Sequence, residues 1–152
     1  MKEILKGALE DLKRKGVEYA DARRVRRLTE ILVMKNGVLE TASLNESEGF
    51  GIRVLRAGAW GFSSSSELTP EKVAETADRA LAIAKASAKV GDQRVVLDGQ
   101  RAIVDTYENG IKEDPFEVPL ADKLAILSGA CDGMSRTDEV KFATASLLSW
   151  RT

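Results

Sequence analysis

Residues 48–62 read Glu48-Gly49-Phe50-Gly51-Ile52-Arg53-Val54-Leu55-Arg56-Ala57-Gly58-Ala59-Trp60-Gly61-Phe62. Apolar residues recur at every second position from Phe50 to Val54, the period of a β-strand. After Ala57-Gly58 the chain returns through Trp60 and Phe62, which predicts a hairpin with both aromatic rings anchored in the core. Glycines inside strands lower strand propensity, so they indicate bulges or close approach of another chain segment. Three positions are of this kind: Gly49, Gly51 and Gly61.

A helix is predicted directly after this hairpin. Thr69 suits the N-cap and Pro70 the first helical position, because proline lacks the N–H that a first turn leaves unbonded. Small apolar residues then recur at helical spacing as far as Ala88. A stripe made mainly of alanine predicts close packing of the helix onto a sheet.

Toward the N-terminus, residues 3–15 have helical periodicity, and Gly16 suits a left-handed cap. A strand is predicted from Tyr19, with residues 30–35 as its continuation or as a second strand. Asn36-Gly37 follows, a strong hairpin signal because both central positions of a type I′ turn need positive φ. Residues 38–44 supply the returning strand.

The last third of the sequence is less regular. A short strand is predicted at 95–97, and the prolines of residues 114–119 make a stiff lead-in to the next element. Residues 120–131 are helical by pattern, and 140–150 alternate as a strand does. The order of elements predicts an α+β fold, with a mostly antiparallel sheet built from hairpins and helices packed on one face. Residues 1–152 are expected to form a single domain.

Composition excludes several classes of function. Lysine plus arginine (23) nearly balance aspartate plus glutamate (24), so no overall field attracts nucleic acid or an anionic membrane. No stretch approaches the length of a membrane span, and the N-terminus has no apolar signal region. The single cysteine excludes an internal disulfide and fits a reducing compartment. We therefore expect a cytoplasmic protein.

The sequence lacks most of the residues that usually bind zinc or activate a nucleophile. Zinc in proteins is held chiefly by histidine and cysteine, and this sequence has no histidine and one cysteine, Cys131. We interpret Cys131 as a small buried hydrophobic residue, since a cysteine nucleophile needs a histidine base. No catalytic or metal-ligating residue and no bound cofactor is predicted in this chain, and the sequence does not identify its substrate-binding residues.

Other candidate motifs favour structural interpretations. The carboxylate pairs Glu46 with Glu48 and Glu113 with Asp114 lie in polar segments, where solvated carboxylates are expected. Residues 63–66 are all serine, but they lack the Gly-x-Ser-x-Gly elbow of a serine nucleophile. The pair Gly49 and Gly51 is not a dinucleotide fingerprint, because the third glycine is missing and a strand follows.

A dense basic cluster is formed by Arg23, Arg24, Arg26 and Arg27. In a strand these side chains divide between two faces, and no aromatic residues alternate with them to stack on bases. Nucleic acid is therefore not an expected partner. A small antiparallel sheet also offers an edge to which an extended peptide could add as a further strand, although the sequence does not locate that edge.

Several segments follow one another in a characteristic order. They are Tyr19-Ala20-Asp21-Ala22-Arg23, Asn36-Gly37, Glu48 to Val54, Gly58-Ala59-Trp60-Gly61-Phe62-Ser63-Ser64, the helix after Pro70, Asp105-Thr106-Tyr107, and Asp114-Pro115-Phe116-Glu117-Val118-Pro119-Leu120. In this order, nearly the whole chain resembles the N-terminal domain of the TldD/PmbA family. The last segment is similar to the TldD branch in particular.

The resemblance implies a function for the whole protein. Family members are zinc metallopeptidases of the cytoplasm that act on unfolded peptides, as homodimers or as TldD/PmbA pairs, and an older label calls them modulators of DNA gyrase. Their His-Glu-x-x-x-His metal motif and their ligand cysteine lie in the C-terminal half. No position here can inherit a metal ligand, since there is no histidine and Cys131 does not occupy the ligand cysteine's place. Zinc is expected only in the full-length protein.

We therefore expect the N-terminal, non-catalytic domain of a TldD-like metallopeptidase, truncated before its catalytic domain, which contributes substrate access and dimer contacts. The alternative is a stand-alone module that binds a peptide or a partner through a sheet edge, and nucleic-acid binding is a less favoured third hypothesis. The natural substrate and the oligomeric state are not predicted.

Overall fold

The computed structural model describes residues 2–91, 94–99 and 103–152. Its elements are α1 (Lys2–Arg14), β1 (Tyr19–Lys35), β2 (Val38–Arg56), β3 (Ala59–Ser65), α2 (Pro70–Val90), α3 (Leu120–Met134) and β4 (Thr144–Arg151). The strands form an open antiparallel sheet in the order β3-β2-β1-β4, which confirms the predicted α+β class.

The chain divides into two compact units, and both long strands contribute to each. Unit 1 comprises the described residues of 1–26 and 48–102, and unit 2 those of 27–47 and 103–152. Each unit has its own hydrophobic core. The expectation of a single domain over residues 1–152 stays a prediction.

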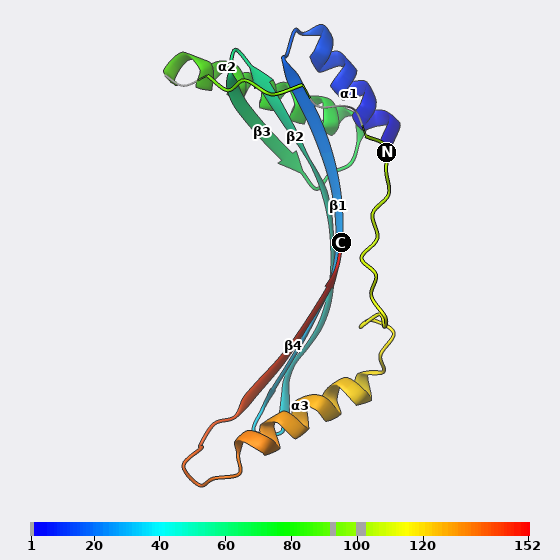
Figure 1. Ribbon diagram of the computed structural model, residues 1–152, viewed down its shortest axis with the longest axis vertical. Coiled ribbons are helices and arrows are strands. Elements are labelled where there is room, and N and C mark those ends of the chain that lie inside the picture. The colour runs from blue at the N-terminus through cyan, green and yellow to red at the C-terminus, as the bar shows by residue number, and fades with distance from the viewer. Residues whose placement is uncertain (1, 92–93, 100–102) are drawn as a thin grey trace. The chain divides into compact units, whose positions relative to one another are not determined.

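Unit 1 is built on the predicted hairpin between β2 and β3. Ala57 and Gly58 form the turn with positive φ values of 52° and 73°. One face of the hairpin is buried by α1 and α2, which lie against the strands in Figure 1. The buried set comprises Phe50, Ile52 and Val54 from β2, Leu5 and Leu12 from α1, and Val73, Ala77, Ala80, Leu81 and Ala84 from α2.

The alanine stripe of α2 packs directly on the backbone of β3. A Cβ atom added at Gly61 would lie 2.0 Å from the Ala80 carbonyl oxygen and 2.4 Å from the Ala84 nitrogen. Glycine is therefore required where the strand meets the helix, as the sequence indicated. The helix begins as predicted, because the Thr69 hydroxyl accepts a hydrogen bond of 3.2 Å from the Lys72 N–H.

The prediction that Trp60 and Phe62 anchor the core is wrong. Both belong to the face of β3 that α1 and α2 leave open, opposite the buried positions Gly61 and Ser63. Phe62 is 57% exposed. The cause is the close approach of α2, which leaves no room for an aromatic ring between helix and strand.

The short strand predicted at 95–97 is also wrong. Residues 94–99 form no regular element, although the Val95 N–H donates a hydrogen bond of 2.8 Å to the Gly58 carbonyl. This single backbone bond holds the segment after α2 beside the β2–β3 turn. One bond does not make a ladder, and three apolar residues were too short a run to distinguish a strand from an extended loop.

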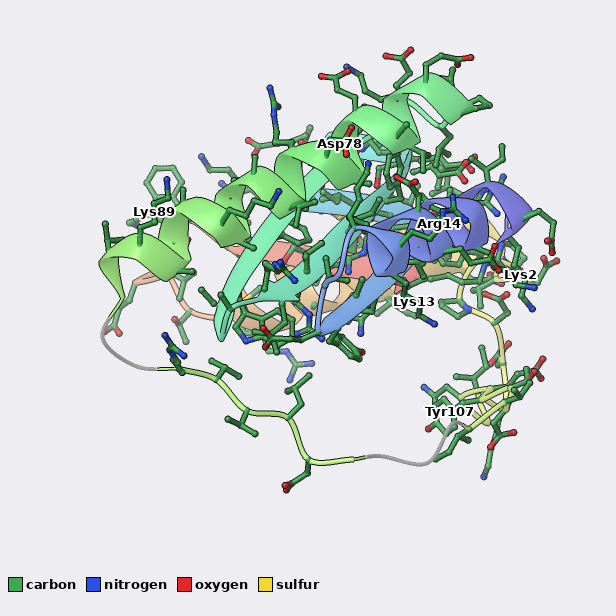
Figure 2. All side chains as sticks on the ribbon, turned by 90° about the horizontal axis from the view of Figure 1, so that it is seen from above. Lys2, Lys13, Arg14, Asp78, Lys89 and Tyr107 are labelled. Carbon is green, nitrogen blue, oxygen red and sulfur yellow. The ribbon has the colours of Figure 1, made fainter. Side chains whose placement is uncertain are left out.

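An ion pair joins the two helices of unit 1. The ammonium group of Lys15, just after α1, lies 2.6 Å from carboxylate oxygens of both Asp11 and Asp78. Figure 2 labels Asp78 on α2 and Arg14, the residue before Lys15 in the sequence, at the end of α1. The hydrogen bonds that Lys15 donates to the Asp11 and Asp78 carboxylates raise the pKa of Lys15 above its usual value. Gly16 then ends the helix with φ +76°, the left-handed cap that was predicted.

Unit 2 contains the second predicted hairpin. Asn36 and Gly37 have positive φ values of 48° and 77°, which confirms the turn between β1 and β2. The Asn36 side-chain oxygen accepts a hydrogen bond of 2.8 Å from the Ala143 N–H, which ties the turn to the chain entering β4. The strand β4 then pairs antiparallel with β1 from Leu28 to Lys35.

The helix α3 covers one face of the β1–β4 pair, beside which it lies in Figure 1. Leu127 and Cys131 pack with Leu32 and Met34 of β1 and with Ala143. None of the helices in the described part of the chain is long and apolar enough to cross a membrane.

Candidate functional site

The open face of unit 1 is hollowed into a groove of about 760 Å³. Three strands supply its walls and floor. The lining residues are Asp21, Arg23 and Val25 of β1, Gly49, Phe50, Gly51 and Arg53 of β2, and Phe62 and Ser64 to Ser66 at the end of β3. Alternation places these side chains together, because Gly51 pairs with Ser64 and Arg53 with Phe62 on the same face of the hairpin.

The groove exists because two residues of β2 have no side chain. A Cβ atom at Gly51 would lie 2.7 Å from the Phe62 ring, so the ring rests on bare backbone. At Gly49 the same atom would lie 3.1 Å from the Ser65 carbonyl oxygen. Phe62 thus offers an exposed aromatic surface whose other side packs against the backbone of Gly51.

A polar cluster stands at the Arg53 end of the groove. The Arg53 guanidinium donates to the Asp21 carboxylate at 2.9 Å through Nε and lies 2.8 Å from it through a terminal nitrogen. The same guanidinium lies 4.5 Å above the Trp60 ring, and Tyr19 meets Trp60 edge to face at 5.9 Å. The hydrogen bond to Asp21 raises the pKa of Arg53 above its usual value. Arg53 is therefore a fixed, charge-compensated group.

The basic cluster of β1 divides between the two faces of the strand, as predicted. Arg23 lines the groove, whereas Arg24 on the other face pairs with Glu48. Arg27 donates to the Thr152 hydroxyl in unit 2. The arginines therefore do not form one continuous basic stripe.

The remaining sequence candidates are dispersed. Ser63 is buried under α2, while Ser64 to Ser66 border the groove. Glu48 is half-buried beside Arg24. Asp114 accepts a hydrogen bond of 2.9 Å from the Phe116 N–H and lies 2.7 Å from Arg151. Glu46 is also engaged in an interaction, and Glu113 is exposed. The two carboxylate pairs do not meet in a common site.

The donor set does not fit a zinc site. Cys131 is buried as predicted, and its Sγ lies 3.7 Å from the carbonyl oxygens of Met34 and Ala143. Across residues 2–91, 94–99 and 103–152, no group of three or more acidic or cysteine side chains could hold a metal ion. With no histidine in the sequence, this chain has no residues with which to assemble the zinc ligands expected of a metallopeptidase.

Sequence reasoning missed the groove, although one signal was present. Gly49, Gly51 and Arg53 share one parity, so the face opposite Phe50 and Ile52 had to combine bare backbone with charge. Such a face suits a surface that another chain approaches closely. The long-range neighbours Asp21 and Phe62 could not be assigned to it from spacing alone.

Comparisons with known proteins agree with the sequence resemblance. Residues 20–84 match the family model described as PmbA/TldA metallopeptidase domain 1. This segment includes every residue that lines the groove. A metalloprotease of Methanocaldococcus jannaschii is 29% identical over 122 residues, 80% of this chain and 27% of the relative. A metalloprotease of Methanothermobacter thermautotrophicus is 33% identical over 114 residues, 75% of this chain and 24% of the relative. The chain thus spans about a quarter of these relatives' length.

Solved structures share the fold. A protein described as a modulator of DNA gyrase from Bacteroides thetaiotaomicron matches with a TM-score of 0.73 at 11% identity, over 98% of this chain and 34% of its own. TldE from Thermococcus kodakarensis matches with a TM-score of 0.61 at 18% identity, over 94% of this chain and 33% of its own. Together with the family model and the two metalloproteases, these matches show that the chain belongs to the PmbA/TldD metallopeptidase family, of which it carries the first domain.

Proposed function

We propose that this chain is the non-catalytic first domain of a longer metallopeptidase and that its groove gives unfolded peptides access to the enzyme. Support comes from the metalloprotease relatives, which are about four times as long as the matched segment. The donor set points the same way, because the chain has no histidine with which to bind a catalytic zinc. Zinc and its chemistry belong, in this proposal, to the remaining part of the full-length protein.

The groove itself is the observation that carries the substrate role. It combines an exposed aromatic ring, bare glycine backbone and a row of serine hydroxyls within the segment that matches the family model. An extended peptide needs apolar surface for alternate side chains and hydrogen-bonding groups for its own backbone. Phe62 supplies the first, and Ser64 to Ser66 supply hydroxyls for the second.

We further propose that unit 2 contributes the dimer contacts, with a second copy or with a paired family subunit. On the face of the β1–β4 pair away from α3, Ile31 is paired with Leu148, and Trp150 lies opposite Thr29. Leu148 and Trp150 are 57% and 61% exposed. Large apolar side chains grouped on a sheet face are typical of a surface that another protein covers.

A second candidate function is a stand-alone module that binds peptides by strand addition. The sheet order makes β3 and β4 its two edge strands, and these are the strands to which a peptide adds in this alternative. In this alternative the peptide pairs with an edge backbone, and the groove side chains contribute little to affinity.

Phe62→Ala separates the two candidates. Loss of the exposed ring is expected to weaken binding of an unfolded peptide about tenfold, because a central aromatic contact typically contributes more than 1 kcal/mol. The measurement is fluorescence anisotropy with a dye-labelled decapeptide of serine and leucine that carries one Glu-Ser-Phe segment and blocked ends. The far-ultraviolet circular dichroism of the variant should equal that of the wild type, since the side chain removed is largely exposed.

The matched control is Phe142→Ala, which removes an exposed phenylalanine from unit 2 and should leave affinity unchanged. Mass spectrometry of the peptide after titration with zinc present should show it intact. Equal affinities of wild type and Phe62→Ala would favour edge binding instead. Cleavage of the peptide by the purified chain would contradict the non-catalytic role.

A further inference from the structure

The groove holds one cationic group whose charge the rest of the described structure leaves unmatched. Arg53 is neutralised by Asp21 at 2.8 Å and is stacked on Trp60. Arg23 lines the same groove, is exposed, and has no ion pair or hydrogen bond with the residues in the described ranges. An exposed guanidinium that no neighbour occupies can bind an incoming carboxylate through two parallel N–H donors.

The exposed aromatic ring of Phe62 lies across the groove from Arg23. Arg23 is on β1 and Phe62 on β3, with β2 between them, so their backbones are separated by about two strand spacings, or about 10 Å. In an extended peptide, side chains two residues apart point the same way and lie about 7 Å from each other. The long arginine side chain can cover the difference.

We infer that the groove selects unfolded peptides in which an acidic side chain stands two residues from an apolar or aromatic one. The peptide carboxylate accepts hydrogen bonds from Arg23, and the apolar side chain packs on Phe62 over the bare backbone of Gly51. This inference rests on the proposed substrate role of the groove and specifies the peptides that it takes. A nucleic acid fits less well, because the Asp21 carboxylate interrupts the groove and only one cation is unmatched.

The test compares three dye-labelled decapeptides that differ only at the first residue of the Glu-Ser-Phe segment. That residue is Glu, Gln or Lys. Their ends are blocked, so that the variable side chain is the only charge near the phenylalanine. Wild-type chain should bind the Glu peptide about fivefold more tightly than the Gln peptide, the gain of one partly exposed ion pair. The Lys peptide should bind more weakly than either.

Arg23→Gln should remove the preference between the Glu and Gln peptides, and Arg23→Glu should reverse it in favour of the Lys peptide. The matched control is Arg27→Gln, which makes the same change of net charge on the same strand but in unit 2, and which should keep the wild-type preference. Both positions are exposed, so neither change is expected to disturb folding.

Each outcome decides a different point. A Glu preference that Arg23→Gln removes and Arg27→Gln keeps supports the inference. Equal binding of all three peptides by the wild type overturns the inference and leaves the substrate role of the groove intact. A Glu preference that persists in Arg23→Gln overturns the assignment to Arg23. Failure of the wild type to bind any peptide overturns the proposed substrate role and, with it, the inference.

Discussion

Gly61→Ala is expected to lower the free energy of unfolding of unit 1 by about 4 kcal/mol or more, enough to unfold a domain of ordinary stability. The added Cβ would stand 2.0 Å from the Ala80 carbonyl oxygen and 2.4 Å from the Ala84 nitrogen. Both are backbone atoms in the middle of α2, so no side-chain rotation relieves the clash. The helix would have to move away from β3, which opens the core at Ala77, Ala80 and Ala84.

Guanidinium chloride unfolding checks this expectation. The chain has two tryptophans, Trp60 in unit 1 and Trp150 in unit 2. In a Trp150→Phe background, fluorescence therefore reports on unit 1 alone. Gly51→Ala is the control, because it puts the same methyl group on the other face of the hairpin against the ring of Phe62. That ring is exposed and can turn aside, so the unfolding midpoint of Gly51→Ala should stay near that of the parent. Equal midpoints for Gly61→Ala and the parent would show that α2 does not pack on β3 as described.

Lys123→Met is expected to destabilise unit 2 by about 3 kcal/mol or more. Lys123 lies on the inner side of α3 with its side chain 5% exposed, and its ammonium group is 2.7 Å from Glu30 on β1, whose side chain is 15% exposed. Removing the lysine leaves a carboxylate in an apolar environment without a partner. The cost of an unpaired buried charge exceeds the attraction that the pair itself contributes.

A double variant distinguishes this cause from a loss of packing. Glu30→Leu combined with Lys123→Met replaces the ion pair by two apolar side chains and should recover most of the lost stability. Lys141→Met makes the same substitution at an exposed position of unit 2 and should change the unfolding free energy by about 0.5 kcal/mol or less. If single and double variants unfold at the same denaturant concentration, the Glu30–Lys123 pair does not carry the effect.

Local signals in the sequence predicted the elements well because each depends on neighbouring residues only. Asn36-Gly37 favours a type I′ turn because both residues tolerate the positive φ that this turn needs. Thr69 accepts a hydrogen bond from a free N–H of the first helical turn, and Pro70 has no N–H to satisfy. The alternation from Phe50 to Val54 likewise identified both the strand and its buried face. The α+β class followed from the order of these elements.

Faces that depend on distant partners were harder to assign. Trp60 and Phe62 have the same parity, so the strand pattern alone fits either face, and aromatic size favoured the core. The alanine stripe of α2 held the correcting information, because a helix that packs so closely needs a glycine opposite it and excludes a ring. Lys123 gave no local sign of burial, since its partner Glu30 lies 93 positions away.

Amide chemical shifts test the central claim most directly, namely that the open face of unit 1 is the peptide-binding surface of a domain without catalytic residues of its own. The measurement is a ¹H–¹⁵N correlation spectrum of the labelled chain during titration with the Glu-containing decapeptide. We predict shifts concentrated in three segments, residues 21–25, 49–53 and 62–66, which together line the groove. Shifts concentrated in residues 27–47 and 103–152, or no shifts at saturating peptide, would contradict this account.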